Sequence, residues 1–228
     1  MAIWKIKTDK NWLISLKDRP DRFNNVKKQF EKHKIDYELF YGINGKKIGL
    51  FFTKRNSEWY LSNHWYGQNI EIDMIPTTRC PFPKSKMAGM AGCFLSHFLC
   101  IQDAYMKWYE RIAIFEDDVI FSDDFVKRLE KEIKEVPENW DILYLWRQSQ
   151  RGNTPTYHSK NIVVPNDVRW MHGYMVQWKG IKKLYDLLCE WQTDHIDVMI
   201  NRKFSKELNI YGFWEQLCHQ WLSQSNIA

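Results

Sequence analysis

The sequence has few cysteines, and their spacing argues against two kinds of site. Its 228 residues include five cysteines and no Cys-X-X-Cys pair. They are Cys80, Cys93, Cys100, Cys189 and Cys218. An odd number without paired spacing argues against a disulfide framework and against a zinc site. The cysteine content therefore fits a reducing compartment.

Long apolar segments and blocks of one charge are also missing. No apolar run approaches the length of a membrane span, and lysines interrupt the N-terminal segment MAIWKIKTDKNWLISL, unlike a signal peptide. We therefore expect a cytoplasmic protein, with any membrane contact made peripherally from the inner face. The net charge of +5 is spread among acidic residues, so nucleic acid is not an implied partner.

Pairs of basic residues recur along the chain, and they allow two interpretations. They could hold an anionic substrate or contact an anionic membrane. We favour solvated faces of helices and loops. The pairs are Lys27-Lys28, Lys46-Lys47, Lys54-Arg55, Lys182-Lys183 and Arg202-Lys203.

The chain is rich in aromatic residues, and its length favours one globular domain. Aromatic residues make up 16% of the chain and include twelve tryptophans, an excess typical of binding surfaces that have flat apolar faces. We find no internal repeat and no low-complexity tract. A core of full size is expected for a chain of this length.

The first part of the chain alternates strand and helix patterns. Residues 11–16 predict a short buried strand, and apolar residues at helical spacing from Asp21 predict a helix. A second predicted strand, residues 37–43, ends at the turn dipeptide Asn44-Gly45. Strand, helix and strand in this order predict a βαβ unit with a parallel sheet, and hence an α/β fold.

The rest of the chain is regular except for residues 46–86, where breakers and aromatic residues follow no period. We expect a long excursion there, and a flexible lid is one interpretation. Further helices are predicted over 90–109, 122–136, 179–191 and 214–222, and further strands over 111–115, 140–146 and 171–178. Ser122 is the expected N-cap of its helix, with Asp123 and Asp124 in the first turn.

Three carboxylates follow the predicted strand 111–115 directly. Alternate side chains of a strand share a face, so Glu116 and Asp118 are expected on one side and Asp117 on the other. At the carboxyl end of a parallel strand they would face the ligand crevice of an α/β fold. Two carboxylates there could hold Mn²⁺ or Mg²⁺. The alternative is a solvated turn before the next helix.

Several segments in order resemble glycosyltransferase family 25, which includes bacterial lipooligosaccharide galactosyltransferases and the collagen galactosyltransferase domain. ISLKDRPDRF is similar to the family pattern INLxxRxxR, YGINGKKI loosely to AVDG, GMAGCFLSH to GExGCxLSH, and EDDV matches in full. The later segments DILYLW, HGYMVQWKGIKKL and HIDVMI keep the family order and spacing. The resemblance covers nearly the whole chain and is weakest over 46–86 and beyond 209.

The resemblance implies a GT-A type fold with a Rossmann-like mixed sheet flanked by helices. It implies one catalytic domain, with a nucleotide-sugar half over roughly 1–120 and an acceptor half over roughly 121–228. The implied activity is inverting transfer of a hexose, galactose above all, from a UDP-sugar to a glycan, glycolipid or glycoprotein. Asp118 and Glu116 would hold Mn²⁺ or Mg²⁺, with Asp117 assisting.

The resemblance also implies roles for residues outside the acidic cluster. Donor-binding candidates are Leu16, Arg19, Arg22, Asn44, Ser96, His97 and Asp117. For the two arginines a salt bridge to Asp18 or Asp21 is equally expected, and His97 is otherwise a satisfied interior residue. Cys93 is read as a packing residue rather than a nucleophile.

Asp197 is the expected catalytic base, with Asp194 in reserve. An N-cap for a helix starting near Val198 is an equal alternative for Asp197. Candidates for a further metal ligand are His172, His195 and His219. Most tryptophans should pack in the core, while Trp146 and Trp170 are candidates for stacking on a sugar ring.

The sequence departs from the family pattern at two positions, which keeps other functions open. Met90 stands where the family has Glu, and Asn44 stands where it has Asp. A catalytically degenerate binding or scaffold protein is therefore the main alternative. A metal-dependent nucleotidyltransferase or sugar-nucleotide hydrolase would need the same grip on a diphosphate.

Overall fold

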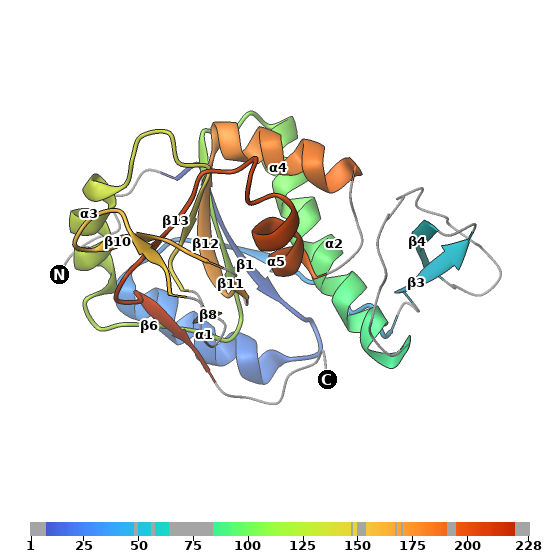
Figure 1. The fold of residues 1–228 in the computed structure, drawn as a ribbon. Helices are drawn as coiled ribbons and strands as arrows, with labels where there is room; N and C mark the ends of the chain where they lie inside the picture. Colours follow the sequence, from blue (N-terminus) through green and yellow to red (C-terminus); the bar gives the residue numbers. More distant parts are fainter. Residues whose placement is uncertain are drawn as a thin grey trace.

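The computed structural model shows a mixed sheet with helices on both faces (Figure 1). It describes residues 8–47, 50–55, 58–63, 84–146, 148–149, 154–166, 168–169, 171–190 and 195–221. The main sheet has eight strands, in the spatial order β2 (Glu38–Tyr41), β1 (Lys10–Ser15), β5 (Arg111–Glu116), β12 (Gly173–Gln177), β7 (Ile142–Tyr144), β13 (Ile210–Phe213), β10 (Ile162–Val164) and β9 (Thr156–Tyr157).

Helices and small strand pairs complete the described part of the chain. The helices are α1 (Pro20–His33), α2 (Lys84–Met106), α3 (Phe125–Glu132), α4 (Trp178–Glu190) and α5 (Ile196–Val198), with the 3₁₀ turn η1 (Ile133–Glu135) and the π-helical turn η2 (Met199–Lys203). The pairs are β3 (Leu50–Arg55) with β4 (Glu58–Asn63), β6 (Val119–Phe121) with β14 (Cys218–Gln220), and β8 (Gln148–Ser149) with β11 (Val168–Arg169). None of the described helices is both long and apolar enough to cross a bilayer.

The predicted βαβ unit and the α/β fold are confirmed. Strand β1 pairs in parallel with both β2 and β5, and helix α1 connects β1 to β2. Strand β12 runs antiparallel to β5 and to β7, so the sheet is mixed. This topology brings the end of β5 and the start of β12 to the same edge of the sheet.

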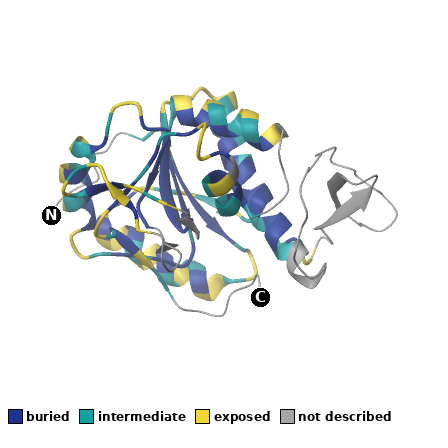
Figure 2. Cartoon of the chain, in the orientation of Figure 1, coloured by how far each residue is buried: buried dark blue, intermediate teal, exposed yellow. Residues whose placement is uncertain are grey.

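Both faces of the sheet are buried, which explains why its strands read as continuous apolar runs. Trp12 and Ile14 of β1 pack in the cluster that includes α2 and α4, whereas Leu13 packs on the opposite face with α1 and α3. Ile114 and Phe115 of β5 divide in the same way. Figure 2 shows these buried strands between the helices.

Two glycines allow the turn after β2 to lie directly against helix α2. A Cβ on Gly45 would meet the carbonyl oxygen of Ala88 at 1.7 Å, and a Cβ on Gly92 would meet that of Ile43 at 2.3 Å. No side chain fits at either position. The predicted turn at Asn44-Gly45 is therefore also a packing contact, and it brings Asn44 close to α2.

The C-terminal segment differs from its prediction. A helix was predicted over 214–222, but Cys218–Gln220 form strand β14, which pairs antiparallel with β6. The local pattern alternates instead, since Cys218 is buried and His219 is exposed. Pairing with β6 satisfies the backbone there and overrides the helical spacing of the apolar residues.

The start of helix α3 also differs from its prediction. Ser122 is not the N-cap, because the helix begins at Phe125 and Asp124 occupies the cap position without a side-chain cap bond. Asp123 therefore lies before the first turn, where it pairs with Lys32 at 2.6 Å. In the region 46–86, for which no period was found, the described residues include the β3–β4 hairpin.

Candidate functional site

The acidic cluster lies where β5 ends, and strand alternation directs its side chains. Glu116 continues the face of Ile112 and Ile114 and so points toward α2, while Asp117 points toward α1. The backbone N–H of Glu116 donates to the carbonyl of His172 at 2.9 Å. This bond brings the residue before β12 to the end of β5.

Glu116 and Asp118 converge on one imidazole, so the predicted common face holds in part, since Asp118 also contacts Arg22 of α1. Nδ1 of His172 lies 2.6 Å from Oε2 of Glu116 and 2.7 Å from Oδ1 of Asp118. His172 is 4% exposed and Asp118 is 5% exposed. Of the three histidines considered as a further metal ligand, the structure brings His172 to the carboxylates.

The charges of this group stabilise one another. Burial alone would lower the pKa of His172, but the two carboxylates raise it to about 10. Burial likewise favours a higher pKa for Glu116, whereas His172 and His97 hold that pKa well below its ordinary value. A positive charge thus lies between two negative ones, at a position that suits a cation.

Asp117 belongs to a buried group on the α1 side, which Arg22 connects to Asp118. Its Oδ1 lies 2.9 Å from Nε of Arg22, and its Oδ2 accepts a hydrogen bond of 2.7 Å from the Ser15 hydroxyl. Arg22 also reaches Oδ2 of Asp118, with Nη2 at 2.5 Å. Burial raises the pKa of Asp117 to about 6, although Arg22 and Ser15 oppose the rise.

The two arginines expected near the nucleotide have different partners. Arg19 pairs with exposed Asp21 at 2.9 Å, which confirms the salt bridge given as its alternative. Arg22 instead bridges Asp117 and Asp118, partners that the sequence analysis missed because they depend on how α1 packs against the sheet. Diphosphate binding by either arginine stays a prediction.

The last described strand holds Asp118 from a third side. Nε2 of Gln220 donates to Oδ2 of Asp118 at 3.2 Å, and the backbone N–H of Trp221 donates to the Asp118 carbonyl at 2.6 Å. His219, on the same strand, is exposed. Strand β14 therefore helps to hold the carboxylate of Asp118, together with Arg22 and His172.

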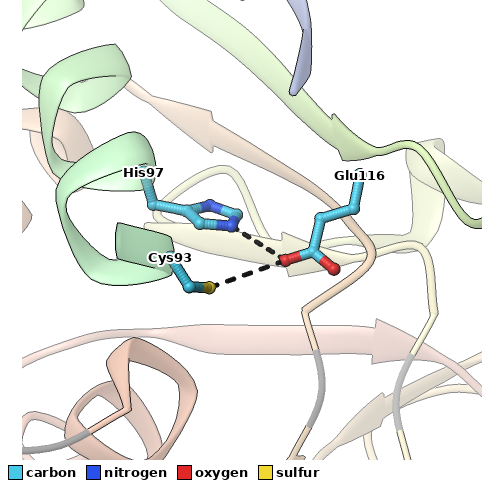
Figure 3. A group of neighbouring side chains, drawn as sticks. All are labelled: Cys93, His97 and Glu116. Atoms are coloured by element: carbon cyan, nitrogen blue, oxygen red, sulfur yellow. Dashed lines mark hydrogen bonds and ion pairs between the residues drawn. The ribbon is translucent and has the colours of Figure 1, made fainter. Parts of the chain in front are cut away.

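Helix α2 contributes a second group to the same carboxylate cluster (Figure 3). Nε2 of His97 lies 3.0 Å from Oε1 of Glu116, and Sγ of Cys93 lies 3.9 Å from the same oxygen. His97 is 1% exposed, and its Nδ1 contacts the hydroxyl of Tyr174 at 2.9 Å. Burial and Glu116 raise the pKa of the Cys93 thiol well above its ordinary value, as expected for a residue that is no nucleophile.

The other predicted donor-binding residues lie in the turns around β1, β2 and α2. The Ser96 hydroxyl donates to the Gly92 carbonyl at 2.7 Å and accepts from the N–H of Ile43 at 2.8 Å, so it fastens the turn after β2 to α2. Nδ2 of Asn44 donates to Asp18 at 3.1 Å. Leu16 follows β1 and is half-buried. For Leu16, Asn44 and Ser96, donor binding stays a prediction.

Asp197 borders the cluster from helix α5. It is half-buried, and its charge contributes to the raised pKa of Cys93. The N-cap alternative is wrong, because α5 begins at Ile196 with His195 at its cap position. Instead, Oδ1 of Asp197 accepts from the N–H of Val198 at 2.8 Å. Its role as the base stays a prediction.

Met90, one of the two positions that depart from the family pattern, lies in the core. Met90 is 1% exposed and packs in the apolar cluster beneath α2. Trp146 is 9% exposed, and its ring lies 4.9 Å from that of His172, so it packs beside the candidate site. Trp170 and Asp194 lie outside the described residues.

Several members of the basic pairs have acidic partners on the surface, as the interpretation we favoured requires. Lys27 pairs with Glu31 and Lys182 with Asp186, each one helical turn away. Lys183 differs, because it pairs with buried Asp141 at 2.6 Å.

The donor set at the end of β5 fits a divalent cation. Glu116, Asp118 and His172 offer two carboxylate oxygens and one imidazole nitrogen, all within 4.8 Å of one another. Carboxylates are the ligands that Mn²⁺ and Mg²⁺ prefer, and an imidazole nitrogen is compatible with Mn²⁺. A cation there would lie between the two acids and would require His172 to be neutral.

Comparisons with known proteins agree with the resemblance. A family model described as "Glycosyltransferase family 25 (LPS biosynthesis protein)" matches residues 8–200. Procollagen galactosyltransferase 1-A of Xenopus laevis is 29% identical over 187 residues, which cover 79% of this chain and 28% of that protein. Procollagen galactosyltransferase 2 of Homo sapiens is 25% identical over the same coverage of 79% and 28%.

One of the similar proteins is named as an inactive member of the family. Inactive glycosyltransferase 25 family member 3 of Homo sapiens is 27% identical over 186 residues, covering 79% of this chain and 29% of that protein. The chain thus spans 28 to 29% of the length of these relatives. Among solved structures, the one titled "Crystal Structure of A197 from STIV" is 10% identical, with a TM-score of 0.43 over 94% of this chain and 86% of that one.

Proposed function

The chain belongs to glycosyltransferase family 25, and from this premise we propose that it transfers a hexose from a UDP-sugar to a hydroxyl group of a glycan, glycolipid or glycoprotein. One observation carries the proposal: Glu116, Asp118 and His172 converge at the carboxyl end of β5. Ligands of α/β folds bind at such ends. Galactose is the proposed hexose because two of the relatives are named galactosyltransferases.

The proposed reaction is a single displacement at the anomeric carbon. The acceptor oxygen forms a bond to this carbon while the bond from the carbon to the UDP oxygen breaks, and UDP leaves with the electron pair. Attack from the opposite side inverts the configuration. The acceptor proton passes to Asp197, a half-buried carboxylate that borders the cluster.

Glu116, Asp118 and His172 are the residues that would hold Mn²⁺ or Mg²⁺. The bound ion supplies positive charge that neutralises the diphosphate as it departs. Arg22 and Gln220 hold the carboxylate of Asp118 in position, and Arg22 also holds Asp117. We assign Asp117 to this supporting layer, because its contacts are with Ser15 and Arg22.

The donor is proposed to lie over the turns that follow β1 and β2. Leu16, Arg19 and Asn44 lie on these turns, and Ser96 and His97 lie on the segment of α2 beneath them. We propose that residues from roughly 1 to 120 bind the nucleotide-sugar and that the remainder binds the acceptor.

The test is release of UDP from a panel of UDP-hexoses with Mn²⁺ and candidate acceptors. We expect Asp118→Ala to reduce turnover by at least about 1,000-fold, corresponding to about 4 kcal/mol in the barrier. Asp124→Ala, an exposed acid six residues later, serves as the matched control and should retain activity. Asp197→Ala should reduce turnover while leaving Mn²⁺ binding intact. If the Asp118→Ala variant released UDP as fast as the wild type, the proposal would be overturned.

A second candidate is a binding protein that keeps the fold without turnover. Met90 favours it, since this residue is buried in the core at the position where the motif has Glu. A relative named as inactive adds support. In that case the wild-type chain would bind UDP-sugars with Mn²⁺ in calorimetry and release no UDP with any acceptor.

A further inference from the structure

We propose that Cys93, His97 and Glu116 form a second cation site, which binds Zn²⁺ beside the site at Asp118 and His172. The sequence analysis argued against zinc because the chain has no Cys-X-X-Cys pair. The structure brings the donors together in another way. Cys93 and His97 are four residues apart and share one face of α2, and β5 supplies Glu116 opposite them (Figure 3).

Two of the separations between donor atoms are close to those of a zinc shell. Bond lengths of about 2.3 Å to sulfur and about 2.0 to 2.1 Å to nitrogen and oxygen place tetrahedral ligands about 3.5 Å (S to O) and about 3.3 Å (N to O) apart. Sγ of Cys93 lies 3.9 Å from Oε1 of Glu116, and Nε2 of His97 lies 3.0 Å from the same oxygen. These two separations differ from the ideal values by a few tenths of an ångström, and all three donor atoms lie within 4.8 Å of one another.

His97 is oriented as metal-binding histidines usually are. Its Nδ1 lies 2.9 Å from the hydroxyl of Tyr174, in a site where His97 is 1% exposed. With its proton on Nδ1 donated to the Tyr174 oxygen, the ring presents the lone pair of Nε2 to the cluster. A polar partner on the second ring nitrogen fixes the tautomer of most histidine ligands.

The two oxygens of Glu116 point to different partners. Oε1 contacts Cys93 and His97, whereas Oε2 contacts His172 at 2.6 Å. A carboxylate whose two oxygens face different groups can bridge two cations, with one cation at each oxygen. The two sites therefore share Glu116 and differ in every other ligand.

Ligand chemistry separates the ions that the two sites prefer. A thiolate selects Zn²⁺ over Mg²⁺ and Mn²⁺, while the oxygen-rich set at Asp118 prefers the harder ions. Binding displaces the Cys93 proton to solvent, because a coordinating thiol is deprotonated. The negative charges of Asp118 and Asp197 act on the same thiol and so attract a cation. Three protein donors leave a fourth tetrahedral position for water.

The test uses Co²⁺ as a spectroscopic substitute for Zn²⁺ in the purified chain and does not depend on sugar transfer. We expect a near-ultraviolet sulfur-to-cobalt charge-transfer band that Zn²⁺ abolishes and an equal concentration of Mg²⁺ does not. Cys93→Ser should remove the band, and His97→Gln or Glu116→Gln should weaken Zn²⁺ binding by more than about 100-fold in calorimetry, the upper end of the loss for mere supporting residues. Thermal melting checks that each variant folds.

Two matched controls make the assignment specific. Cys189→Ser removes an exposed thiol and should leave the band unchanged. Asp118→Asn should weaken Mn²⁺ binding while the cobalt–thiolate band remains, which separates this site from the proposed donor site. A folded wild-type protein without the band would overturn the proposal, as would a band that survives Cys93→Ser.

Discussion

Buried acids lie at both edges of the main sheet where its strands begin or end, and the partners of these acids differ between the two edges. At the start of β7, Asp141 is 1% exposed, and its Oδ2 accepts from Nζ of Lys183 at 2.6 Å and from the N–H of Asn209 at 2.8 Å. At the opposite edge, Glu116 and Asp118 share one imidazole between them. At the first edge one acid is paired with one lysine, whereas at the second edge several acids lie close together.

The difference teaches that burial of a carboxylate does not by itself mark a functional site. Asp141 connects β7 to the segment before β13 and to α4, and these partners account for the contacts of Oδ2. Glu116 and Asp118 are two positions apart in the sequence, so the repulsion between their carboxylates is built into the chain and favours a shared cation. The close approach of several carboxylates, more than their burial, distinguishes the candidate site.

Removing the buried guanidinium should give the largest change in stability and would test this distinction directly. Arg22 is 10% exposed at its side chain and neutralises Asp117 and Asp118. We expect Arg22→Met to lower the free energy of unfolding by about 3 to 5 kcal/mol in urea titrations without divalent ions, since two buried carboxylates lose their cation. Mn²⁺ should restore part of this loss by binding the folded state.

Arg19→Met is the matched control for that variant. Its ion-pair partner Asp21 is exposed, so the expected loss is below about 1 kcal/mol. Equal losses of unfolding free energy in the two variants would show that Arg22 does not neutralise a cluster of mutually repelling carboxylates.

A change at the other edge should affect stability without affecting metal binding. Asp141→Ala removes the acceptor for Lys183 and for the backbone of Asn209, and we expect a loss of about 2 to 3 kcal/mol in urea unfolding. Mn²⁺ affinity, measured by calorimetry, should match that of the wild type. A Mn²⁺ affinity reduced as far as in Asp118→Ala would remove the distinction between the edges.

The smallest effect is expected at an acid that follows the cluster closely in sequence. The side chain of Asp123 is 93% exposed and pairs with Lys32. Asp123→Ala should leave the free energy of unfolding close to that of the wild type, and added salt should reduce any difference further. A loss of stability comparable to that of Asp141→Ala, or weaker Mn²⁺ binding, would place Asp123 in the site after all.

The features set by local periodicity could be predicted from the sequence. The period of two in a strand is enough to direct Glu116 to the α2 side. Asp117 and Asp118 lie in the turn after β5, and Asp118 contacts both His172 and Arg22, so alternation alone does not place it. The order of strand, helix and strand gave the parallel pairing of β1 with β2 in the same way. These predictions needed no knowledge of distant contacts.

The features set by packing between distant segments could not be predicted. Arg22 meets Asp117 only because α1 lies against the face of the sheet to which Asp117 points. The predicted helix over 214–222 failed because the pairing of β14 with β6 depends on a strand about 100 residues earlier in the chain. A cysteine and a histidine four residues apart on α2 were a readable signal for a metal ligand pair, but their partner on β5 was not.

The contact of β14 with Asp118 has a consequence for how the protein reaches its working form. Gln220 and Trp221 hold a residue that was synthesised 102 and 103 positions earlier, by hydrogen bonds to its side chain and backbone. Contacts between such distant segments are slow to form, since a long loop must close first. A nascent chain that has folded its first strands still lacks the two restraints that Gln220 and Trp221 place on Asp118. The proposed cation site would gain these restraints only after residues 220 and 221 have been added.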